Sequence, residues 1–169
     1  MQTFNYISVV FIYLLIVILC KPIQSLPLER YRQEALAQHN LFRAQCKAEP
    51  LQYNATLEQR AQAWCDQSAS TGQFNHSGTI EYGETSYKKS PFDFNQDNGA
   101  TPVFAWFNEK SKYSVANPET ALHFTQVVWK NSRQFGLGIC NVTNGGVLFV
   151  ANYYPRGNYK DQFAANVDC

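Results

Sequence analysis

Two stretches of the sequence decide the fold. His123–Ser132 reads HFTQVVWKNS, and Leu148–Tyr159 reads LFVANYYPRGNY. The first stretch lies in a segment that opens with Asn117-Pro118-Glu119, and proline close behind a polar cap residue is typical of a helix start. We expect this helix to continue to about Asn131. The second stretch begins in a run of β-prone residues, so the two stretches together predict a helix followed by a strand.

The segment between and around these stretches predicts a hairpin. Phe135–Val142 and Val147–Tyr154 are both rich in β-branched and aromatic residues. They are joined by Thr143-Asn144-Gly145-Gly146, and Asn-Gly between two such runs favours a tight antiparallel turn. Upstream, residues 74–87 are mixed in character and are expected to contain an irregular strand, whereas the polar residues 88–100 are expected to form a loop.

The first helix is predicted over residues 28–45. Apolar side chains recur there at steps of three or four, which places them on one face of an amphipathic helix. His39 falls on this apolar face, and we interpret it as a packed, hydrogen-bonded residue. The face consists of Leu28, Tyr31, Ala35, His39 and Phe42.

Two more helices follow from local start and stop signals. Residues 55–71 form a second amphipathic segment, with Asn54 as its N-cap and Gly72 placed to end it. Thr101-Pro102 is expected to begin a third helix. This helix would carry on one side Trp106, Glu109 and Tyr113. The chain is therefore expected to adopt an α+β fold, with helices around a small antiparallel sheet.

The N-terminal residues predict export. The chain has 169 residues, the size of one domain, and a net charge of +1, which argues against nucleic acid as a partner. Ile7–Cys20 is an apolar run of 14 residues, short for a membrane span but typical of a signal peptide. We expect a signal peptide over residues 1–25 and one domain over residues 26–169 of a secreted, extracellular protein. An uncleaved signal-anchor is the alternative.

Export makes the remaining cysteines informative, because disulfides form and persist in oxidising compartments. Four cysteines lie outside the predicted signal peptide: Cys46, Cys65, Cys140 and Cys169. They allow three pairings, and the sequence does not choose among them. We favour Cys46–Cys65 with Cys140–Cys169, because the members of each pair are close along the chain.

Three sequons predict that the exported chain is a glycoprotein. They are Asn54-Ala-Thr56, Asn75-His-Ser77 and Asn141-Val-Thr143. A glycan on Asn75 would stand beside His76.

The two stretches resemble the paired signatures of the CAP superfamily, which comprises cysteine-rich secretory proteins, antigen five and pathogenesis-related proteins. His123–Ser132 is similar to the first signature and Leu148–Tyr159 to the second. His39-Asn40 with Arg43 looks like the first-helix motif of the family. The resemblance covers essentially the whole chain after the signal peptide, and the chain is similar to the Golgi-associated and plant pathogenesis-related branches. It implies a three-layer α-β-α sandwich with a small antiparallel sheet between helices.

The resemblance also identifies four site residues: His76, Glu84, Glu109 and His123. Two imidazoles with adjacent carboxylates suit a borderline divalent cation, and Zn²⁺ is the expected cofactor. The glutamates would either bind the metal or accept the far ring N–H of each histidine and so fix its tautomer.

Aromatic residues near the predicted cleft are candidates for contact with a ligand. Sterol-exporting members of the family carry an aromatic loop before the second histidine, and here only Tyr113 of that loop is present. A different set, Tyr87, Phe92 and Phe94, lies in an earlier loop. Packing of that loop against the core is the alternative explanation of these three residues.

Three functions are compatible with the sequence. The leading hypothesis, implied by the resemblance, is a secreted non-enzymatic protein that binds a lipid, either sterol or fatty acid, or another small ligand. The second is a metal-assisted hydrolase with Glu84 or Glu109 as general base. The third is an interaction module that docks an extracellular protein partner through the loop at residues 85–104.

Overall fold

The computed structural model describes residues 28–169, so the predicted signal peptide, residues 1–25, lies outside the described part of the chain. None of the helices within residues 28–169 is both long and apolar enough to span a membrane. The elements in chain order are α2 (Leu28–Gln45), β1 (Gln52–Tyr53), α3 (Ala55–Thr71), β2 (Gly83–Lys89), α4 (Ala100–Asn108), α5 (Leu122–Val128), β3 (Gln134–Val142), β4 (Gly146–Tyr154) and α6 (Phe163–Asn166). Two short 3₁₀ helices, Glu109–Lys112 and Pro118–Ala121, flank the loop between α4 and α5.

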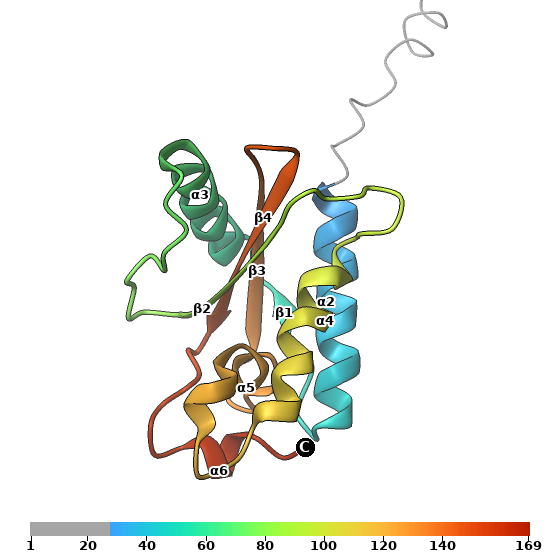
Figure 1. Ribbon diagram of the computed structural model, residues 1–169. Coiled ribbons are helices and arrows are strands. Elements are labelled where there is room, and N and C mark those ends of the chain that lie inside the picture. Colours follow the sequence, from blue (N-terminus) through green and yellow to red (C-terminus); the bar gives the residue numbers. More distant parts are fainter. Residues whose placement is uncertain (1–27) are drawn as a thin grey trace, which may run out of the picture.

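The fold has three layers, as predicted. A four-stranded sheet in the order β1-β3-β4-β2 lies in the middle. Helix α3 covers one face, and α2, α4 and α5 lie on the other side (Figure 1). The predicted hairpin is confirmed, since β3 and β4 pair antiparallel with Asn141 opposite Val147. The sheet is not wholly antiparallel, because the two-residue strand β1 pairs parallel with β3.

Helix α3 packs against the sheet at very short range. A Cβ at Gly136 or Gly138 of β3 would overlap the α3 backbone near Leu57 and Ala61, so only glycine permits this approach. The ends of α3 are as predicted. The Asn54 side-chain oxygen accepts backbone N–H bonds from the first turn, and Gly72 ends the helix in the left-handed conformation with φ 69°.

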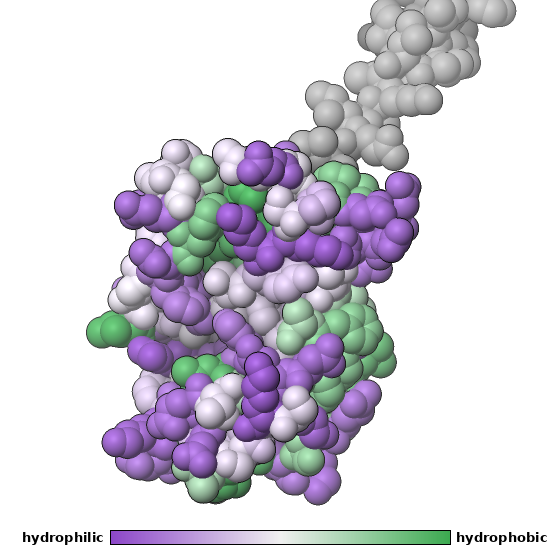
Figure 2. Space-filling model, viewed as in Figure 1, coloured by the Kyte–Doolittle hydropathy of each residue, from purple (hydrophilic) through white to green (hydrophobic). Residues whose placement is uncertain are grey.

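The other face of the sheet carries the larger core. It is built from aromatic and branched side chains of α2, α4, α5 and the sheet, including the fully buried Trp129, Phe135 and Phe149. His39 of α2 is also fully buried there, which confirms its interpretation as a packed residue. Most of the visible surface is hydrophilic, with an apolar area over α2 and α4 (Figure 2). Leu41 and Phe104 are exposed on these two helices.

The third and fourth predicted helices, which correspond to α4 and α5, differ from the prediction. Helix α4 begins at Ala100, one residue before the expected cap, because the Asn98 side chain accepts the Ala100 N–H. It ends at Asn108, so Glu109 lies in a 3₁₀ turn and Tyr113 lies beyond it. The single helix expected to run from Asn117 to about Asn131 is instead a 3₁₀ turn followed by α5, which ends at Val128.

The favoured disulfide pairing is wrong. The structure pairs Cys46 with Cys169 and Cys65 with Cys140. Cys46 follows α2 on one side of the sheet, whereas Cys65 points from α3 toward the opposite face, so these two thiols cannot meet. Cys140 lies on the face of β3 that α3 covers, which places it against Cys65. Nearness in sequence was therefore a poor guide, because the sheet separates the neighbouring helices.

Candidate functional site

The two stretches that decide the fold interlock beside the site. The Gln126 side chain, buried in α5, accepts the Gly157 N–H at 2.9 Å. Thr125 donates its hydroxyl to the Asn158 side-chain oxygen at 2.7 Å, and Asn158 donates in turn to the Leu122 carbonyl at 2.9 Å. Helix α5 and the loop after β4 thus hold each other in place, which positions the histidine at the start of α5.

Arg43 of α2 fixes the far end of α5. Its guanidinium is fully buried and donates to four backbone carbonyls, those of Glu49, Val127, Trp129 and Ser132. Burial lowers the pKa of Arg43 to about 10, and the nearby Arg133 charge acts in the same direction. Val127, Trp129 and Ser132 are buried residues, so the guanidinium supplies their carbonyls with a donor where water does not.

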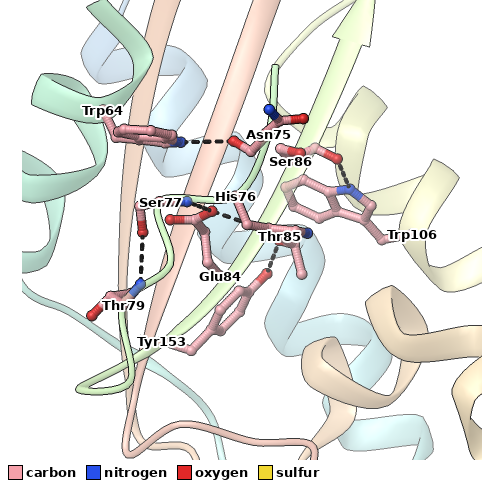
Figure 3. Close-up of polar contacts among 10 residues, drawn as sticks. All are labelled: Trp64, Asn75, His76, Ser77, Thr79, Glu84, Thr85, Ser86, Trp106 and Tyr153. Carbon is pink, nitrogen blue, oxygen red and sulfur yellow. Dashed lines mark hydrogen bonds and ion pairs between the residues drawn. The ribbon is translucent and has the colours of Figure 1, made fainter. Parts of the chain in front are cut away.

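The first histidine–carboxylate pair joins a loop to strand β2. His76 lies in the loop after α3, and the Trp64 indole N–H holds that loop by donating to the Asn75 carbonyl at 3.1 Å. The Nδ1 atom of His76 lies 2.8 Å from Glu84 Oε1, which also accepts the Ser77 N–H at 3.0 Å (Figure 3). An ionised carboxylate only accepts hydrogen bonds, so Nδ1 carries the proton and Nε2 is the free ring nitrogen.

The same contacts set the charge of this pair. The hydrogen bond to Glu84 raises the pKa of His76 above its ordinary value, against the opposing effect of burial. Burial by itself would raise the pKa of Glu84, but the hydrogen bonds from His76 and Ser77 outweigh it and bring the pKa below its ordinary value. The second oxygen, Glu84 Oε2, is buried without a hydrogen-bond partner among the described residues.

The second pair repeats this arrangement on other elements. Glu109 lies in the 3₁₀ turn after α4, and His123 lies in the first turn of α5. Glu109 Oε1 is 2.8 Å from His123 Nδ1, and Glu109 Oε2 accepts the His123 backbone N–H at 3.1 Å. Each glutamate therefore holds one ring nitrogen and one backbone N–H, and each histidine keeps Nε2 free.

Both histidines line one cleft of about 480 Å³. Glu84 also lines it, whereas Glu109 stands behind His123. The structure therefore brings His76, Glu84 and His123 to the cleft, whereas Glu109 contacts it only through His123. Within residues 28–169 no group of three His, Cys, Asp or Glu side chains is arranged to hold a metal. The cleft is bordered by charged and polar side chains that the sequence did not single out, including Glu119, Arg156, Asn158 and Lys160.

A buried hydrogen-bond chain runs from α2 to the residue beside Glu84. His39 Nδ1 lies 2.7 Å from the Ala35 carbonyl and must donate to it, so Nε2 accepts from the Tyr153 hydroxyl at 2.8 Å. The Tyr153 oxygen then accepts from the Thr85 hydroxyl at 3.2 Å (Figure 3). Burial lowers the pKa of His39 to about 3, so this ring is neutral and its tautomer is fixed.

The four aromatic candidates for ligand contact do not come together. Phe92 and Phe94 line a second, apolar cavity of about 300 Å³. Tyr87, expected in the same loop, lies instead in strand β2 and packs on Phe149, with ring centroids 6.4 Å apart. Tyr113 packs instead on Phe124 near α5. Only the pair in the loop after β2 is thus placed to meet a ligand at this cavity.

The three sequons lie in different settings. Asn54 is half-buried and its side chain caps α3. Asn75 is exposed next to His76, as expected. Asn141 is exposed near the end of β3 and lines the apolar cavity.

Comparison with known proteins identifies the family. The family model described as "Cysteine-rich secretory protein family" (CAP) matches residues 36–153. The chain belongs to the CAP family. Pathogenesis-related leaf protein 6 of Solanum lycopersicum is 34% identical over 135 residues, which cover 77% of this chain and 80% of the relative. Secreted protein RBT4 of Candida albicans is 33% identical over 76% of this chain, but only 36% of its own length is matched.

Solved CAP structures share the fold. The structure titled "Structure of BmVAL-1" superposes with a TM-score of 0.65 at 24% identity, covering 83% of this chain and 82% of that chain. "Crystal structure of NaASP2 with Zn2+" gives 0.63 at 22% identity, covering 78% and 82%. The two disulfides and a relative named as secreted point to an extracellular protein.

Several residues that build the site were not predicted from the sequence. Gln126 and Asn158, which join α5 to the loop after β4, both lie within the two quoted stretches, so their polar character inside apolar segments was the available signal. The backbone N–H of Ser77 has no sequence signal, because any residue supplies one. Arg156 and Lys160 border the cleft only through the path of their loop.

Proposed function

We propose that this CAP protein acts outside the cell as a binding protein and not as an enzyme, and that its cleft holds a divalent metal ion, zinc in the first instance. The observation that carries the proposal is the matched pairing of each Nδ1 with a carboxylate. His76 and His123 both face one cleft with Nε2 as the free ring nitrogen. Neutral imidazole nitrogens of this kind are the usual protein ligands of zinc.

The residues present fit such an ion. Histidines that bind metal commonly donate the other ring N–H to a carboxylate, which fixes the ring and raises its basicity. Glu84 and Glu109 are placed for this supporting role, and each is held by a second backbone N–H. Two protein ligands leave open coordination positions. When bound, zinc supplies positive charge and Lewis acidity at the cleft, and Arg156 and Lys160 add further positive charge at its border.

The same geometry argues against a hydrolase. A general base needs a carboxylate that faces the substrate and takes up a proton near neutral pH. Glu109 stands behind His123 outside the cleft lining, and Glu84 is tied to two N–H donors that lower its pKa. Both glutamates are thus better placed to orient histidines than to accept a proton from water.

Zinc titration by calorimetry at pH 7.5 tests the metal proposal. We expect the variant with His76→Ala and His123→Ala to lose zinc binding while its circular dichroism stays native. Glu84→Gln and Glu109→Gln should each weaken binding by about 10- to 100-fold, because the rings lose their orienting carboxylates. Glu119→Gln is the matched control, since it removes a cleft carboxylate that bonds neither ring. Unchanged zinc affinity in the double histidine variant would rule out this site.

A second candidate function is favoured by the apolar cavity. Its lining combines Phe92 and Phe94 with Leu28, Tyr31, Ile139, Val147 and Phe149, and its volume of about 300 Å³ is at the lower end for small-molecule pockets. We propose that it holds part of a lipid, such as an acyl chain. Protein purified without detergent should yield a stoichiometric sterol or fatty acid by mass spectrometry, and Phe94→Ser should reduce it. Phe104→Ser, which replaces an exposed phenylalanine of α4 outside the cavity lining, should leave the amount of bound lipid unchanged.

A further inference from the structure

The apolar cavity lies where three segments meet at one end of the sheet. These are the first turn of α2, the hairpin end of β3 and β4, and the loop after β2 (Figure 1). Phe92 of the loop is buried, whereas Phe94 is 62% exposed although it also lines the cavity. The two rings meet edge to face with centroids 5.0 Å apart. Phe94 therefore stands at the mouth of the cavity with much of its ring in water.

The Asn141 side chain leaves the sheet on the face that carries the larger core. Residues two apart on a strand share a face, so Asn141 points to the same side as Ile139. Its partner across the ladder is Val147, and the partner of Ile139 is Phe149. Ile139, Val147 and Phe149 are all buried. An exposed asparagine thus closes a row of buried apolar residues, and it contributes to the cavity wall together with Phe94.

This asparagine begins the sequon Asn141-Val142-Thr143. A glycan on an exposed residue away from the cavity would project into solvent without touching the core. A glycan on Asn141 starts instead from an exposed residue of the cavity lining, so its first sugar lies beside the mouth of the cavity. The innermost N-acetylglucosamine presents C–H bonds and an acetamido methyl group, which are suited to an exposed aromatic face.

We propose that the N-linked glycan of Asn141 packs on the Phe94 ring, covers the mouth of the apolar cavity and so restricts entry of an apolar ligand. The role in ligand entry rests on the proposed lipid-binding function of this cavity. The contact between sugar and ring does not, because it needs only the glycan and the exposed face of Phe94.

The first test measures occupancy and ligand entry. The chain is secreted from a eukaryotic host, and glycopeptide mass spectrometry determines whether Asn141 is modified; an unmodified Asn141 overturns the proposal. Binding of cis-parinaric acid, a fluorescent fatty acid, is then titrated. We expect Asn141→Gln to bind about fivefold more tightly than the glycosylated protein, the factor equivalent to about 1 kcal/mol. Thr143→Ala, which keeps Asn141 but destroys the sequon, should behave in the same way.

The matched control is Asn75→Gln, which removes the glycan predicted beside His76 at the cleft and should leave parinaric acid binding unchanged. Equal affinity in the glycosylated protein and in Asn141→Gln overturns the role in ligand entry. Tighter binding in Asn75→Gln as well would show a general effect of glycans and would also overturn it.

The second test needs no ligand and separates the two proposals. Loss of the Asn141 glycan should lower the melting temperature in the parent protein but not in a Phe94→Ala background, because the ring that the sugar contacts is absent there. Equal shifts in both backgrounds overturn the packing proposal. If no form binds parinaric acid, the lipid-binding function fails, and the presence or absence of this coupling still decides whether the glycan covers Phe94.

Discussion

The neutral His39 imidazole predicts a specific dependence of stability on pH. His39 is fully buried, and burial lowers its pKa from 6.5 to about 3. Its Nδ1–H donates to the Ala35 carbonyl, and Nε2 accepts the Tyr153 hydroxyl. Protonation would place a second N–H against a hydroxyl that already donates to the ring. In the unfolded chain the imidazole binds a proton near pH 6.5, so the unfolded state gains protons first and the folded state loses stability as the pH falls below 6.5.

The magnitude follows from the two pKa values. Between the folded value of about 3 and the unfolded value of 6.5, the free energy of unfolding falls by about 1.4 kcal/mol per pH unit. Integration from pH 7 to pH 5 gives a loss of about 1.9 kcal/mol from this one group. His76 acts with the opposite sign, because its pKa is raised by Glu84 and its protonation favours the folded state. A stability curve of the parent protein alone therefore does not isolate His39.

The assay is urea denaturation of the parent protein and of His39→Gln at pH 7, 6 and 5 and constant ionic strength. The stability advantage of the parent over His39→Gln should shrink by about 1.9 kcal/mol from pH 7 to pH 5. His76→Gln is the matched control, and there the advantage of the parent should grow over the same range. If the advantage over His39→Gln stays constant, the pKa of His39 is not lowered by burial. If this variant does not fold, NMR of the parent decides, because the His39 ring protons should not titrate between pH 7 and pH 4.

Three further variants test the packing. Arg43→Met removes the side-chain donor of four backbone carbonyls, of which those of Val127, Trp129 and Ser132 belong to fully buried residues, and should lower the free energy of unfolding by at least about 3 kcal/mol, measured in urea; a loss under about 1 kcal/mol would contradict the role given to the guanidinium. Gly138→Ala should cost about 1–3 kcal/mol, because its Cβ meets the α3 backbone, and an unchanged melting temperature would show that α3 moves away freely. Joint replacement of Cys65 and Cys140 by serine should cost about 2–5 kcal/mol, and mass spectrometry of an unreduced digest should find these two cysteines in one cross-linked peptide pair.

Local signals in the sequence were sufficient for the first two helices. The apolar spacing of residues 28–45 and the cap residues Asn54 and Gly72 predict α2 and α3 with the observed bounds. The hairpin of β3 and β4 also follows from its own residues. In each case the signal and the structure it predicts lie within one element. The three-layer arrangement, by contrast, came from the resemblance to the CAP family.

The wrong predictions concern features that depend on contacts between residues far apart in the sequence. The helix expected to continue to about Asn131 ends at Val128, because the following carbonyl, that of Trp129, turns to the Arg43 guanidinium on α2. The favoured disulfides ignored the sheet that separates α2 from α3. Strand β1 has only two residues and exists through its pairing with β3, so no periodicity could reveal it.

The sequence named the four residues of the candidate site but left the roles of the two glutamates open. His76, Glu84, Glu109 and His123 were matched through the resemblance, and the sequence allowed the glutamates to be either metal ligands or supports for the rings. The distances of 2.8 Å from both Nδ1 atoms to carboxylate oxygens favour the second role. The aromatic candidates separated because Tyr113 follows the 3₁₀ turn that carries Glu109, far from the loop after β2.

Anomalous diffraction at the zinc edge, from zinc-soaked crystals of the secreted chain at pH 7.5, tests the proposed metal site most directly. We expect one strong peak in the cleft, about 2.0–2.1 Å from Nε2 of both His76 and His123, with Glu84 and Glu109 still bonded to the Nδ1 atoms. A cleft without a peak, or a zinc ion held by the two glutamates in place of the rings, would contradict the proposal.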